Sequence, residues 1–155
     1  MKILGENGIG RFLKIFLQIC FLGGIILLII LPFLLQMVGL HLNATAIIIY
    51  PNGIALLGIV YQFIGLFDSL KNNNPFCEEN VKRLKKAGVF SISEAILWTI
   101  DLIYELLLVR NFDPVIILVL VFMIILFTGV AIALYILAEL MKQATEYKVE
   151  NELTI

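Results

Sequence analysis

Residues 75–109 decide the fold, and they read PFCEENVKRLKKAGVFSISEAILWTIDLIYELLLV. The stretch opens with charged residues that favour water and continues into an apolar segment, with no breaker stronger than Gly88 between the two. We therefore predict one uninterrupted helix from Pro75 to about Val109. Its first part, residues 75–87, is expected to lie in water, and its second part, about residues 88–109, is expected to span a membrane.

The composition indicates a membrane protein. Hydrophobic residues make up 61% of the 155-residue chain, against roughly 45–50% in soluble domains. The length fits one domain. The formal net charge is −1, and no basic surface suited to a phosphate backbone is evident, so we expect no direct binding of nucleic acid.

The remaining apolar stretches divide into three further spans. No Asp, Glu, Lys or Arg occurs between Ile15 and Phe67, which is too long for one crossing, since about 20 residues suffice. The polar segment 39–45 divides it, and Asp113 followed by Pro114 has the pattern of a helix cap and first helical position. The sequence predicts an all-α, polytopic four-helix transmembrane bundle forming a single domain over residues 1–155. Its spans are expected at about residues 15–38, 46–67, 88–109 and 114–138.

The third span is the least secure of the four. Its twelve Val, Ile, Leu and Phe residues favour insertion by about 0.3–0.6 kcal/mol each. A central Asp101 opposes insertion by roughly 2.5–3.5 kcal/mol. The sum is close to zero, so this helix depends on its neighbours, and a helix lying at the membrane interface is the alternative.

The distribution of cations predicts the topology. Ten of the eleven Lys and Arg residues lie in the N-terminus, the segment between spans two and three, and the tail. By the positive-inside rule both termini are cytoplasmic. We expect a multi-pass protein of the bacterial inner membrane, with cytoplasmic helical extensions of the third and fourth spans over residues 75–87 and 139–155.

Three carboxylates follow one face of the third span. Glu94, Asp101 and Glu105 are spaced by seven and four residues, so they lie within about 40° of one another around a helix. Acidic residues within lipid face the bundle interior or water. The polar residues available as hydrogen-bond partners are Asn52, Gln62, Tyr104 and Thr128. A polar seam joining helices, a sensing or ligand site, and a proton or ion pathway all stay open.

The sequence lacks the elements of a catalytic or metal centre. His41 is the only histidine, and it is predicted in an outside loop with no second metal ligand near it. No phosphate-binding loop, zinc-protease motif or nucleophile elbow occurs. We expect no enzymatic activity, no cofactor, no metal and no catalytic residue.

The charged extensions are the stronger functional lead. The spans on either side of a short turn should pack antiparallel, which brings the two extensions together with complementary charge. They could form a salt-bridged stalk, or a docking platform for a soluble partner. The candidate docking residues are Lys82, Arg83, Lys85 and Lys86 on the first extension and Glu150, Asn151, Glu152, Leu153 and Ile155 in the tail.

Two motifs carry a resemblance to a known family, NPFCEENVKRLKKAG at 74–88 and ENELTI at 150–155. With them the chain resembles the bacterial membrane proteins catalogued as domain of unknown function two-nine-seven-five. The resemblance implies a four-helix inner-membrane protein without an established activity or catalytic residues. It also implies a neighbouring gene for a small helix-turn-helix regulator.

We therefore expect an integral membrane protein that docks or sequesters a cytoplasmic helix-turn-helix transcription regulator. The alternative is a small proton- or ion-linked transporter, or a bacteriocin-immunity-type protein. Lipid is an expected partner in either case, and a homo-oligomer stays open.

Overall fold

The computed structural model describes residues 9–37, 42–71, 76–109 and 113–153, which are helical apart from residues 76, 77 and 113. The helices are α1 (Ile9–Met37), α2 (Leu42–Lys71), α3 (Glu78–Tyr104) with a π-helical turn η1 (Glu105–Val109), and α4 (Pro114–Leu153). Each of the four long helices is apolar and long enough to cross a membrane. The predicted all-α class with four helices is confirmed, and the chain is a multi-pass membrane protein.

Two helix starts follow from local chemistry, one of them later than the sequence indicated. Pro114 begins α4, and the backbone N–H of Val115 donates to Asp113 Oδ1 at 2.9 Å, so the predicted cap is confirmed. Helix α3 begins at Glu78, not Pro75, because Cys77 is extended (φ −143°, ψ 152°) and caps it without a side-chain hydrogen bond. Glu78 and Glu79 occupy the first turn, where the helix dipole favours acidic groups.

Helix α4 is the longest element. Its 40 residues correspond to about 60 Å at 1.5 Å per residue, about twice the thickness of the hydrocarbon core. It continues without a break through residues 139–153, so the fourth span has the predicted helical extension. Where the membrane begins along each helix stays a prediction, as do the four span limits.

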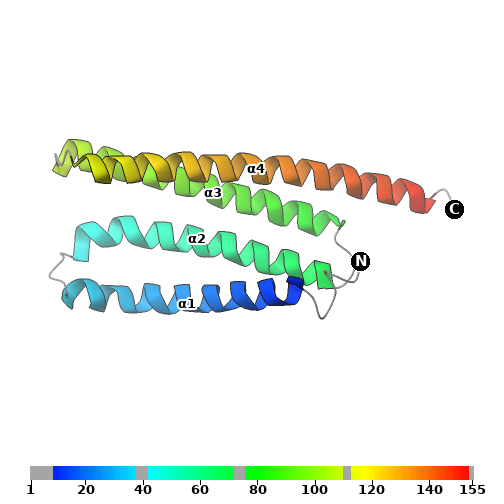
Figure 1. Ribbon diagram of the computed structural model, residues 1–155, viewed down its shortest axis with the longest axis horizontal. Coiled ribbons are helices and arrows are strands. Elements are labelled where there is room, and N and C mark those ends of the chain that lie inside the picture. Colours follow the sequence, from blue (N-terminus) through cyan, green and yellow to red (C-terminus); the bar gives the residue numbers. More distant parts are fainter. Residues whose placement is uncertain (1–8, 38–41, 72–75, 110–112, 154–155) are drawn as a thin grey trace.

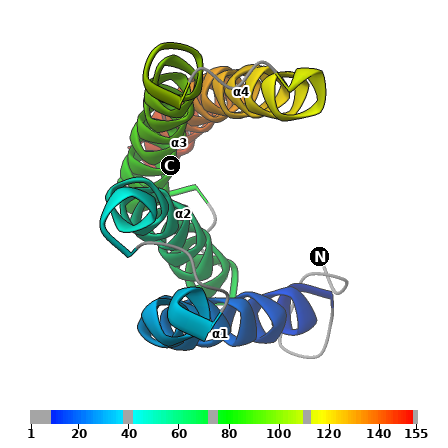
Figure 2. The same ribbon diagram turned by 90° about the vertical axis from the view of Figure 1, so that its left-hand side faces the viewer.

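The helices pack in chain order. Among the described residues α1 contacts α2, α2 contacts α3, and α3 contacts α4, while α1 and α4 do not meet. The four helices lie side by side along the long axis (Figure 1) and form an open arc in end view (Figure 2). Helices α2 and α3 each have a neighbouring helix on both sides. Of these two, α3 carries most of the buried polar residues.

The buried apolar cluster lies between α3 and α4 toward one end of the molecule, with side chains of α2 packed against it. We call this end the charged end; it contains the starts of α1 and α3 and the ends of α2 and α4. Its buried core consists of Leu84 and Ala87 from α3 and Leu134 and Ala138 from α4, and Phe63, Leu66 and Met141 pack against it. Burial of these apolar side chains holds α3 and α4 together below their charged surfaces.

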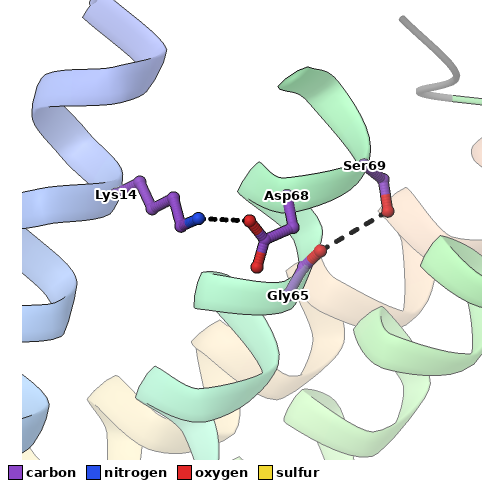
Figure 3. Close-up of polar contacts among 4 residues, drawn as sticks. All are labelled: Lys14, Gly65, Asp68 and Ser69. Carbon is purple, nitrogen blue, oxygen red and sulfur yellow. Dashed lines mark hydrogen bonds and ion pairs between the residues drawn. The ribbon is translucent and has the colours of Figure 1, made fainter. Parts of the chain in front are cut away.

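At the charged end one ion pair joins α1 to α2, and one side-chain hydrogen bond lies within α2. Figure 3 shows Lys14 of α1 paired with Asp68 of α2, and the Ser69 hydroxyl donating to the Gly65 carbonyl at 3.4 Å. Gly65 also leaves room for the next helix, since a Cβ there would lie 1.8 Å from Nη1 of Arg83. The guanidinium of Arg83 thus rests against the backbone of α2.

Candidate functional site

The first candidate site is the buried polar seam between α2 and α3. Ser91, Glu94 and Asp101 of α3 are all buried, and Glu94 exposes only 2% of its surface. The amide Nδ2 of Asn52 on α2 donates to Asp101 Oδ2 at 3.4 Å. The predicted stripe thus lies along the packed side of α3 at Glu94 and Asp101, while Glu105 is half-buried in the π-helical turn.

The seam contains acceptor atoms without donors. Glu94 Oε1 and Glu105 Oε2 are buried and accept no hydrogen bond from the described residues, although the Trp98 indole and the Leu56 backbone adjoin the Glu94 carboxyl. Residues 42–67 of α2 and 114–138 of α4 contain no Lys or Arg to neutralise these groups. A charged group in such surroundings is costly, so the seam can hold protons or a bound cation.

The other polar residues singled out in the sequence are spread along the helices. Asn52 reaches the stripe, as predicted, and Gln62 is buried in α2. Thr128 is exposed and bonds its own helix at Ile124. Within the described residues no group of three or more His, Cys, Asp or Glu is placed to hold a metal ion. Two fully buried residues were missed, Asn80 and Ser91.

The second candidate site is a groove between α3 and α4 at the charged end, with a volume of about 480 Å³. We call it the α3–α4 groove. Its lining comprises Glu78, Val81, Lys82 and Lys85 of α3 and Lys142, Thr145, Glu146, Val149 and Glu150 of α4. Val81 and Val149 are apolar, and the hydroxyl of Thr145 is taken by the carbonyl of Met141 at 2.8 Å. The groove thus combines an apolar interior with a charged rim.

The ion pairs on this rim are weak. Lys82 lies 3.6 Å from Glu78, and Lys142 lies 4.0 Å from Glu139 and 3.8 Å from Glu146. All of these side chains are at least half exposed, and exposed pairs contribute about 0–1 kcal/mol. A docking partner could therefore replace them with its own charges at little energetic cost.

The structure separates the predicted docking residues into three groups. Lys82, Lys85 and Glu150 line the α3–α4 groove. Arg83 turns toward Gly65 of α2, and its Nη2 donates to Glu79 Oε1 of its own helix at 2.5 Å. Lys86 is exposed outside the groove. The side chains of Asn151, Glu152 and Leu153 and all of Ile155 lie outside the described residues.

Most of the groove residues were not singled out in the sequence, although a signal for them exists. Positions 78, 81, 82 and 85 follow the spacing of one helix face, and so do 142, 145, 146, 149 and 150. Each face mixes Lys and Glu with one or two small apolar residues. Two such faces on antiparallel neighbours would have pointed to a shared groove.

Comparison with protein-family models gives a match over most of the chain. The model of a family described as "Protein of unknown function (DUF2975)" matches residues 12–155. No curated protein and no solved structure matches the chain.

Proposed function

Because the chain belongs to the DUF2975 family of proteins of unknown function, and this family gives no activity, we propose a function from the α3–α4 groove. The protein is a membrane-resident regulatory partner that docks a cytoplasmic protein in this groove. Following the resemblance described above, the docked protein is a small helix-turn-helix transcription regulator. Holding it at the membrane limits its access to DNA. In this arrangement both termini lie in the cytoplasm of a bacterium, and the spans lie in its inner membrane.

The observation that carries the proposal is the groove itself. An apolar interior of Val81, Thr145 and Val149 lies between two charged helix faces, on the part of the molecule with the most Lys and Glu. Apolar grooves between helices are common receptors for amphipathic helices. The ion pairs Lys82–Glu78 and Lys142–Glu146 lie on the rim, each within its own helix. Because they are weak and exposed, little stabilisation of the free protein is lost if docking replaces them.

The test is co-purification of the neighbouring helix-turn-helix regulator with the full-length protein in a mild detergent. Thr145→Trp fills the groove, and Gln143→Trp places the same side chain on an exposed part of α4 outside it. The regulator should co-purify with the wild type and Gln143→Trp and be lost from Thr145→Trp. Equal recovery with all three would refute docking in this groove.

A second function is favoured by the seam. The unpartnered, buried Glu94 Oε1 fits a small proton- or ion-linked transporter, or a protein that binds a cationic peptide at this depth. Proton flux into liposomes should then be lost with Asp101→Asn and Glu94→Gln and kept with Glu146→Gln at the charged end. If the wild type gives no more proton flux than empty liposomes, the transporter function is refuted and the seam has a structural role.

A further inference from the structure

The charges around the α3–α4 groove are arranged from one end to the other. Helices α3 and α4 run antiparallel, with Gly88 opposite Tyr135 and with Leu84 and Ala87 packed on Leu134 and Ala138. The first residue of α3 therefore lies beside the last turns of α4. Along the groove toward the spans, residue numbers rise on α3 and fall on α4.

This register gives the groove two electrically different ends. Glu78 begins α3, and Glu146 and Glu150 come late in α4, so three carboxylates gather at the end farthest from the spans. Lys85 and Lys142 lie at the end nearest the spans. Lys82 of α3 is also on the groove and lies 3.6 Å from Glu78. The groove is thus acidic at its distal end and basic at its span-side end.

From this polarity we infer what the groove binds: an amphipathic helix of a protein partner that is basic at one end and acidic at the other. The inference rests on the proposed function and specifies the chemistry of the docked segment. The basic end of that helix lies against Glu78, Glu146 and Glu150, and its acidic end lies against Lys85 and Lys142. Its apolar side chains enter between Val81 and Val149.

The dimensions agree with a helix of a few turns. From Glu78 to Lys85 the groove advances seven residues along α3, or about 10 Å of helix. Two turns of a partner helix cover that distance with apolar residues at i, i+3 and i+4. Opposite charges placed at both ends select one orientation and exclude helices of uniform charge, since like charges facing each other oppose binding.

Binding of fluorescent peptides to the full-length protein in neutral-lipid nanodiscs tests the inference. Three 14-residue helical peptides share one leucine stripe and differ in charge: one is basic in one half and acidic in the other, one is wholly acidic, and one is wholly basic. The two-ended peptide should bind roughly tenfold more tightly than either uniform peptide. The double variant Lys85→Glu/Lys142→Glu leaves the groove lining with five carboxylates against the one cation of Lys82 and should switch the preference to the basic peptide.

A matched control keeps the net charge of that variant. Lys86→Glu/Lys148→Glu changes the same charges on the same two helices at positions that do not line the groove, so it should keep the preference for the two-ended peptide. Equal binding of all three peptides, or the same switch in the control variant, would overturn the inference. So would loss of binding when phosphatidylglycerol is added, since the lysines would then hold lipid headgroups.

Two further outcomes separate this inference from the proposed function. If the regulator co-purifies but the peptides show no charge preference, docking stands and the two-ended helix is wrong. If the peptides behave as expected but no regulator is retained, the groove chemistry stands and the proposed function is wrong. A dimer of this chain that dissociates in Lys85→Glu/Lys142→Glu would assign the groove to self-association and overturn the inference.

Discussion

Gly58 sets how closely α2 approaches α3, and replacing it with alanine should loosen their packing. A Cβ at this position would lie 2.7–2.8 Å from three atoms of the Phe90 ring. Carbon atoms in contact are normally about 3.5–4.0 Å apart, so the ring or the helix has to move by roughly 1 Å. Inserting a methyl group into a packed interior costs about 1–3 kcal/mol.

Thermal unfolding of the detergent-solubilised protein, followed by circular dichroism, measures this cost. For a chain of this length 1 kcal/mol corresponds to about 2–4 °C, so Gly58→Ala should lower the Tm by about 2–12 °C. Gly23→Ala is the matched control, because apart from its chain neighbours and its own helix backbone no atom of the described residues lies within 4 Å of a Cβ there. The control should keep or slightly raise the Tm, since alanine favours a helix over glycine.

A second substitution identifies the cause. Phe90→Leu removes the ring that the new methyl group meets, so Gly58→Ala/Phe90→Leu should cost less than the sum of the two single variants. A strictly additive double variant would refute the reasoning. So would a Gly58→Ala protein as stable as the wild type.

Three other substitutions test individual contacts between helices. Leu84→Ala empties a position that is 1% exposed and should cost about 2–5 kcal/mol; Leu140→Ala, 56% exposed, should change the Tm far less, and equal losses would contradict the assigned core. Asn52→Leu removes the donor to Asp101 and should lower the free energy of unfolding by about 1–3 kcal/mol. The double variant Asn52→Leu/Asp101→Leu should recover much of the Tm, and no recovery would mean that the lost hydrogen bond is not the cause. Lys14→Glu places a like charge beside Asp68 and should lower the free energy of unfolding by about 0–1 kcal/mol, because the pair is partly exposed. The exchange Lys14→Asp/Asp68→Lys should restore the lost stability, and a failure to do so would show that the pair contributes little.

The elements of the fold could be predicted because their causes are local. The four apolar stretches and the polar segments between them can be seen in the sequence itself. The cap at Asp113 depends only on the residues that directly follow it, since its acceptor binds the N–H of Val115. The start of α3 was predicted three residues early, because the sequence contains two possible start signals. One is Asn74 as a cap before Pro75, and the other is the acidic pair Glu78 and Glu79. The extended backbone of Cys77 selects the second.

The sites were only partly predictable because they depend on which faces of neighbouring helices meet. Spacing placed Glu94 and Asp101 on one face, but their burial against α2 comes from packing. Consecutive helical residues point about 100° apart, so Lys82 lines the groove while Arg83 turns toward Gly65 of the other neighbour. A count of cations treats these two residues alike and could not separate them.

The proposed function requires the α3–α4 groove to face the cytoplasm, and cysteine labelling in intact cells measures this most directly. After Cys20→Ser and Cys77→Ser, a single cysteine replaces exposed Glu146 in the groove or exposed Asp113 at the opposite end. A membrane-impermeant maleimide should label Asp113→Cys in intact cells and Glu146→Cys only after permeabilisation. Labelling of Glu146→Cys in intact cells would place the groove outside and contradict the account.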